Sequence, residues 1–70
     1  MIFDMKVSEN FASFFEGTTF VAIDSFDNYN FNVRIGTLSS TKDVANITAS
    51  TDDELNAKLS NLYAKIVGTP

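Results

Sequence analysis

The pattern that most restricts the fold of this chain is an amphipathic repeat near its C-terminal end. Apolar side chains recur there at helical spacing, at Leu55, Leu59, Leu62, Tyr63 and Ile66. A helix with one apolar stripe must bury that stripe against another element. Gly68 and Pro70 favour a stop, because glycine adopts the helix-ending conformation and proline cannot continue a helix. The spacing predicts a helix over residues 52–67.

The residues at the start of this repeat are typical of a helix N-terminus. Thr51 is a preferred N-cap residue, and Glu54 three positions later completes a capping box. Asp52 and Asp53 place negative charge at the positive end of the helix dipole. Glu54 and Lys58 have the spacing of a favourable ion pair. Helix formation therefore accounts for these acidic residues without metal binding or acid–base chemistry.

Two strands and a connecting turn are predicted in the middle of the chain. Residues 30–38 alternate between apolar and polar, and the apolar face holds Phe31, Val33 and Ile35. Residues 18–26 are rich in β-branched and aromatic side chains but alternate less regularly, which favours a central strand covered on both faces. Asp and Asn residues at 27–30 favour a turn. Together these segments predict a β-hairpin.

A second turn and a weaker strand are predicted before the C-terminal helix. Residues 39–42 are polar and favour the turn. Residues 43–49 place Ala45, Ile47 and Ala49 on one face, although Ala and Asn are poor strand formers.

The first seventeen residues predict a short strand followed by a short helix. Residues 2–7 alternate, with Phe3, Met5 and Val7 on one side. Ser8 is a good helix cap, and Gly17 favours a helix end. Between them, three aromatic residues follow helical spacing at Phe11, Phe14 and Phe15.

The predicted element order is therefore (β)-α-β-β-β-α in one domain covering residues 1–70. The simplest packing is an α+β fold, in which a three-stranded antiparallel meander packs on the C-terminal helix. The sheet gains a fourth strand if residues 2–7 join it. A chain of 70 residues has room for one domain, and 44% hydrophobic residues provide a core.

The residue types exclude several chemistries. The chain has no Cys and no His, so it lacks the residues for a disulfide, a zinc-finger site or a Ser-His-Asp triad. Its three glycines are far apart, which excludes a phosphate-binding loop. We expect no catalytic residue, no cofactor and no metal site, and we expect the protein not to be an enzyme.

Charge and hydropathy restrict the binding partners. The net charge is −4 and the five Lys and Arg residues are scattered, so the surface is expected to repel nucleic acid. The longest apolar run, residues 20–23, is far too short to cross a membrane. Charged residues Asp4 and Lys6 interrupt the N-terminal apolar residues, which argues against a signal peptide and favours a cytoplasmic location.

These exclusions leave another protein as the expected partner. The turn between the two predicted strands is the candidate binding site, because turn tips are usually exposed and Tyr is enriched at binding hot spots. Its candidate residues are Asp24, Asp27, Asn28, Tyr29 and Asn30. An acidic protein favours a partner with a basic surface. The role expected is that of a small inhibitor or adaptor of the kind that viral genes encode.

Two alternatives stay open from the sequence. All seven Phe residues lie in the first half of the chain. A single helix on one face of the sheet is not expected to cover all of these rings. This excess points to an exposed apolar patch or a homodimer seam, and hence to a self-assembling structural subunit such as a virion component. The second alternative is a small-ligand binder or a minor enzyme. Mimicry of a nucleic acid by the acidic surface is a special case of binding to another protein.

Overall fold

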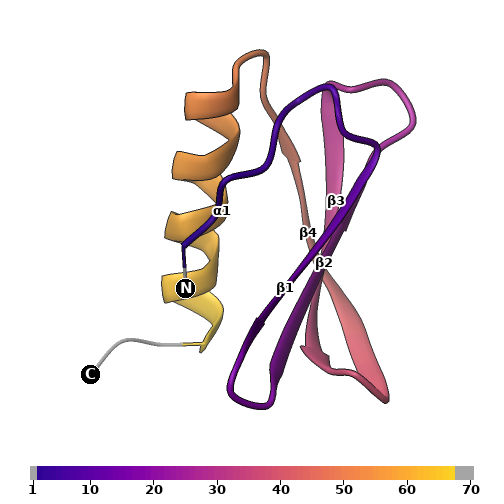
Figure 1. The fold of residues 1–70 in the computed structure, drawn as a ribbon, viewed down its shortest axis with the longest axis vertical. Coiled ribbons are helices and arrows are strands. Elements are labelled where there is room, and N and C mark those ends of the chain that lie inside the picture. The colour runs from indigo at the N-terminus through magenta and orange to yellow at the C-terminus, as the bar shows by residue number, and fades with distance from the viewer. Residues whose placement is uncertain (1, 68–70) are drawn as a thin grey trace.

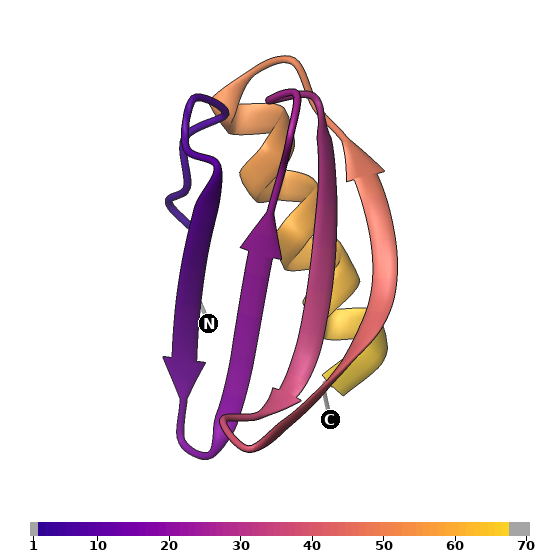
Figure 2. The ribbon, with the colours of Figure 1, turned by 90° about the vertical axis from the view of Figure 1, so that its right-hand side faces the viewer.

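The computed structural model describes residues 2–67 and contains one sheet and one helix (Figure 1). The elements, in chain order, are β1 (Phe11–Glu16), β2 (Thr19–Asp24), β3 (Asn30–Thr37), β4 (Ser40–Thr48) and α1 (Asp52–Val67). All neighbouring strands pair antiparallel, in the spatial order β1-β2-β3-β4. The helix crosses one face of this meander (Figure 2). The predicted α+β class and meander are confirmed.

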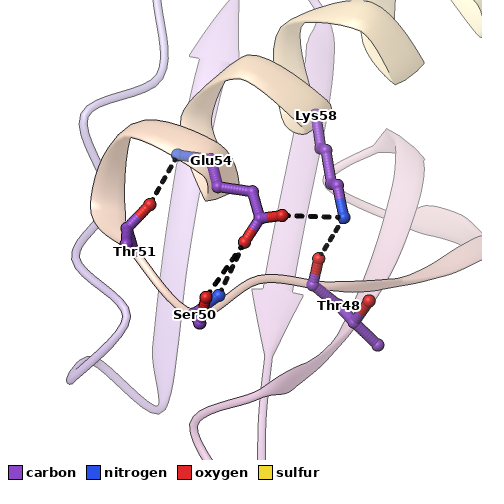
Figure 3. A network of polar contacts seen from close by, with 5 residues as sticks. All are labelled: Thr48, Ser50, Thr51, Glu54 and Lys58. Atoms are coloured by element: carbon purple, nitrogen blue, oxygen red, sulfur yellow. Dashed lines mark hydrogen bonds and ion pairs between the residues drawn. The ribbon is translucent and has the colours of Figure 1, made fainter.

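Helix α1 has the predicted bounds, and its first turn is capped by side chains (Figure 3). The Glu54 amide donates to Thr51 Oγ1 at 3.1 Å, as predicted. The Glu54 carboxylate, however, accepts from the Ser50 amide at 2.8 Å, one residue before the cap. This bond, followed by the charge of Lys58 at 3.4 Å, lowers the pKa of Glu54. The predicted stop at Gly68 and Pro70 lies outside the described residues.

The core lies between α1 and the inner face of the sheet. Its largest fully buried side chains are Met5, Val21, Ile23, Phe31, Val33, Leu55 and Leu59. The alternation predicted for β3 is confirmed, because Phe31, Val33 and Ile35 are all buried. Burial of each such side chain contributes roughly 1.5–3 kcal/mol. Farther along the helix stripe, Ile66 is 47% exposed, so the stripe extends beyond the core.

The predicted N-terminal helix is wrong, because residues 11–16 form the edge strand β1. The sequence FASFF satisfies two spacings, since Phe11, Ser13 and Phe15 also alternate with Ala12 and Phe14. Pairing with β2 selects the strand. Gly17 has a φ of 62° and forms the two-residue turn between these strands with Thr18, so it ends a strand rather than a helix. The sheet therefore has four strands instead of three.

The strand predicted over residues 2–7 is also wrong, although its alternation is correct. Phe3 and Met5 are buried, yet the segment pairs with no strand. Its backbone bonds to α1 instead: Asn56 Oδ1 accepts from the Met5 amide, and Asn56 Nδ2 donates to the Met5 carbonyl, both at 2.9 Å. The Val7 amide donates to Asp52 Oδ1 at 2.8 Å. Helix side chains thus replace a neighbouring strand.

Strand β4 starts earlier than predicted, which shortens the second turn. Only Leu38 and Ser39 connect β3 to β4, and residues 40–42 belong to the strand. A register shift opposite Val33 and Arg34 adds one residue to β4. This β-bulge disturbs the alternation of the strand, which explains its weak sequence pattern.

Candidate functional site

Among residues 2–67, no other element covers the side of the sheet opposite α1, and we call this side the open face (Figure 2). Side chains alternate along a strand, so the residues that neighbour the buried ones point to this face. By the observed register they are Phe11, Ser13 and Phe15 on β1, Phe20, Ala22 and Asp24 on β2, Asn32, Arg34 and Gly36 on β3, and Thr41, Asp43 and Asn46 on β4. The open face therefore combines aromatic, amide and charged side chains.

One end of the open face is apolar. The rings of Phe15 and Phe20 are in contact, with centroids 4.7 Å apart. Beside them, an open hollow of about 530 Å³ lies between the two short turns, and it is lined by Phe15, Gly17, Thr18, Thr37, Leu38 and Ser39. Phe15 is 58% exposed and Leu38 is 73% exposed. Exposed side chains of this size around a hollow are typical of a binding surface.

The other end of the open face is polar and lies beside the loop between β2 and β3. A hollow of about 290 Å³ is lined there by Asp24, Ser25, Phe26, Asp27, Asn30, Asn32 and Asn46. Three of the predicted binding residues, Asp24, Asp27 and Asn30, thus come together. Phe26 lines the same hollow and is fully exposed. The strand predicted over residues 18–26 ends at Asp24 instead, so this ring lies in the loop.

The Asp27 carboxylate holds this loop in shape. It accepts hydrogen bonds from the Tyr29 amide at 3.0 Å, the Asn30 amide at 2.8 Å and Asn30 Nδ2 at 2.8 Å. These bonds, of which those from Asn30 have the largest effect, lower the pKa of Asp27 to about 2. Asp27 is therefore a negative charge at neutral pH, and its position is set by the loop itself.

Asn28 has a structural role that the sequence did not indicate. Its φ is 59°, a conformation that Asn tolerates better than most residues. Its side chain donates to the Val7 carbonyl at 2.8 Å and to Asn10 Oδ1 at 2.9 Å. The Asn28 amide group therefore ties the loop to the N-terminal segment, and its donors are not directed to a partner.

Tyr29, the remaining predicted site residue, is 51% exposed. Its backbone carbonyl accepts a hydrogen bond from the Ala49 amide at 3.0 Å, which fixes the backbone of Tyr29 against the end of β4. Phe31, two residues further along the chain, is completely buried, as the alternation of residues 30–38 predicts. The loop therefore presents Phe26 and Tyr29, while its polar residues mainly hold the loop together.

Two charged residues of the open face, one on β2 and one on β3, each have a side-chain atom without a hydrogen-bond partner among residues 2–67. Within the described part of the chain, neither Asp24 Oδ1 nor Arg34 Nε has a hydrogen-bond partner, although both atoms are out of contact with solvent. On β4, Asp43 Oδ1 accepts from Asn32 Nδ2 at 3.2 Å.

Sequence reasoning missed the apolar end of the open face. The surplus of Phe residues was the available signal, but it could not say which rings are exposed. Among residues 2–67 no three His, Cys, Asp or Glu side chains lie close enough to hold a metal ion. The same residues include no helix of the length and apolarity needed to cross a membrane. Comparisons with protein-family models, curated proteins and solved structures found no match to this chain.

Proposed function

We propose that this chain is a non-enzymatic protein-binding module that uses the open face of its sheet. The observation that carries the proposal is the set of exposed apolar side chains on this face and around the hollows at its two ends: Phe15, Phe26 and Leu38 are 58%, 100% and 73% exposed. Soluble domains rarely leave such side chains beside hollows unless another molecule covers them. Aromatic rings contribute much of the binding energy of protein interfaces, because each buries a large area.

The charges of this region favour a partner with a basic surface. Asp24, Asp27 and Asp43 lie on or beside the open face, and Arg34 is the basic residue among them. The whole chain carries a net charge of −4. Complementary charge accelerates association and excludes acidic competitors. A Lys or Arg side chain of the partner would pair with the carboxylates of Asp24 and Asp27, which line one hollow together with Phe26.

Such a module would act by covering a surface of a larger protein, as an inhibitor or adaptor does. The apolar end would supply the buried contact area, and the acidic end would set orientation. This division of roles predicts that substitutions at the apolar end mainly raise the dissociation rate of the complex. Substitutions of the acidic residues are expected mainly to lower the association rate.

Affinity capture with mass-spectrometric readout tests the proposal. The baits are the wild type, Phe26→Ser, Leu38→Ser and the control Ser60→Ala, which alters an exposed position on α1. We expect one specific partner that is retained by wild type and control and reduced at least tenfold with both Phe26→Ser and Leu38→Ser. Raising the salt concentration is expected to weaken its capture.

Equal retention by all four baits would contradict the use of the open face. Recovery of nucleic acid instead of protein, or of no specific protein under native conditions, would contradict the module itself. Melting curves of each variant check that the substitutions, which lie at exposed positions, leave the fold intact.

A further inference from the structure

The two edges of the sheet differ in how they are protected against pairing with another strand. The β4 edge carries the β-bulge and two charged residues, Lys42 and Asp43, which are the usual devices that block edge pairing. The β1 edge has no bulge, and residues 11–15 contain no charge and no proline. β1 is therefore an open template for another strand (Figure 2).

The backbone groups available on β1 follow from its hairpin. Glu16 and Thr19 close a two-residue turn, so they form a hydrogen-bonded pair, and such pairs alternate along the ladder. The bond from the Ser25 amide to the Asn10 carbonyl, 2.8 Å long, continues the same alternation. Phe11, Ser13 and Phe15 therefore direct their amide and carbonyl groups away from β2. Nothing else among residues 2–67 bonds to these outward groups.

We propose that β1 pairs antiparallel with β1 of a second copy, around a two-fold axis at Ser13. In this register Ser13 meets Ser13, and Phe11 meets Phe15 of the second copy. The outward amides of one strand then face the outward carbonyls of the other. The inner and open faces of the two sheets also remain continuous, because residues opposite each other share a face. The product is one sheet of two meanders with both helices on the same side.

The register is selected by the side chains. Phe11 and Phe15 are 56% and 58% exposed in the single chain, and pairing places each ring against the other. A shift of two residues in one direction sets Phe15 opposite Glu9, and the opposite shift sets Phe11 opposite Gly17. Both shifts lose the aromatic pairs. Only the register centred on Ser13 uses every outward group of the strand.

A second copy is the occupant that the strand fits best. A chain of net charge −4 repels its own copies, but residues 11–15 are the uncharged part of the edge, and they complement themselves. The interface of two short strands and four rings lies at or below the ~1,200 Å² of small stable interfaces, which predicts a weak dimer. The β4 edge does not pair, so assembly stops at two copies. This inference does not depend on partner binding at the open face.

Salt separates the dimer from the proposed partner complex. Added salt screens the repulsion between two acidic chains, so dimerisation is expected to strengthen with ionic strength. Binding of a basic partner is expected to weaken under the same conditions. The two proposals can therefore fail independently.

Sedimentation velocity at increasing protein concentration tests the dimer. The Ser13 amide points outward, so Ser13→Pro leaves the β1–β2 ladder intact and removes the central donor of the dimer. We expect the wild type and Ser13→Ala to shift from monomer to dimer, and Ser13→Pro to remain a monomer with the wild-type circular dichroism spectrum. A wild type that stays monomeric up to millimolar concentration, or a folded Ser13→Pro that dimerises equally, would overturn the inference.

A charge-pairing experiment tests the register without proline. Because Ser13 meets its own copy, Ser13→Lys and Ser13→Asp should each be at least tenfold weaker dimers than the wild type. A mixture of the two should form heterodimers, detected by native mass spectrometry. Homodimers of both variants as strong as those of the wild type would show that Ser13 does not lie at the axis. Complexes larger than two copies would show that an edge other than β1 also pairs.

Discussion

Asp27 illustrates how a polar residue can be exposed and still serve the fold. Its carboxylate accepts hydrogen bonds from Tyr29 and Asn30, and these bonds hold together the loop that contains Phe26. Sequence reasoning chose Asp27 as a binding residue because turn tips are exposed. The structure shows that its first task is local, since its acceptors are already engaged within the loop.

The stability that Asp27 contributes should depend on pH. Its pKa is about 2 in the folded chain and 3.8 ordinarily, so folding favours the ionised form. The contribution is fully present above about pH 4 and is lost as pH falls towards 2. We expect the difference in free energy of unfolding between wild type and Asp27→Ala to shrink across this range, as measured by urea denaturation. An NMR titration midpoint of the Asp27 carboxyl near its ordinary value would contradict this.

At the scale of elements, the hairpin of β1 and β2 explains why the N-terminal prediction failed. Phe11, Phe14 and Phe15 have helical spacing, whereas Phe11 and Phe15 also share a strand face. The local pattern could not decide between a helix and a strand, because each spacing accounts for the same residues. Pairing with β2 selects the strand. The α1 helix had no such ambiguity, since its cap and its stripe agree over the whole element.

The two described glycines should respond differently to substitution. A Cβ on Gly36 would clash with the backbone carbonyl of Ser40 and lie 2.8 Å from Thr41 Cα, so Gly36→Ala is expected to cost about 1–3 kcal/mol through overpacking. At Gly17 a Cβ meets nothing within 4 Å, and only the positive φ is unfavourable, at about 1–2 kcal/mol for Ala. Gly17→Asn should cost less, since Asn tolerates this conformation. Urea denaturation measures all three, and a Gly36→Ala as stable as the wild type would contradict the close approach of β3 and β4.

For the whole molecule, the N-terminal segment completes a core that one helix cannot cover. The ring of Phe3 packs edge-on against Phe14 at 5.0 Å and Tyr63 at 5.9 Å, so it joins β1 to the last turns of α1. Asn56 holds the same segment through the backbone of Met5. Contacts between residues so far apart in the chain follow no local pattern, and sequence reasoning had no signal for them.

Removing the Asn56 side chain should therefore release the N-terminal segment. Asn56→Ala leaves the Met5 amide and carbonyl without partners in a buried setting, and we expect a loss of about 1–3 kcal/mol. Hydrogen exchange at the Met5 amide should accelerate at the same time. The control Asn61→Ala, at an exposed position of α1, should change stability by less than about 0.5 kcal/mol. Unchanged Met5 protection in Asn56→Ala would contradict this anchoring role.

The amino-acid sequence by itself determined those features that depend on neighbouring residues: the helix α1 with its cap, the alternation of β3, and the absence of Cys and His chemistry. These follow from local periodicity and residue type. Tertiary structure alone decided the strand identity of residues 11–16, the inward role of Asn28 and the exposure of Phe15, Phe26 and Leu38. The physical reason is that pairing and coverage depend on residues distant in the chain, and one helix buries one face of a sheet and leaves the other open.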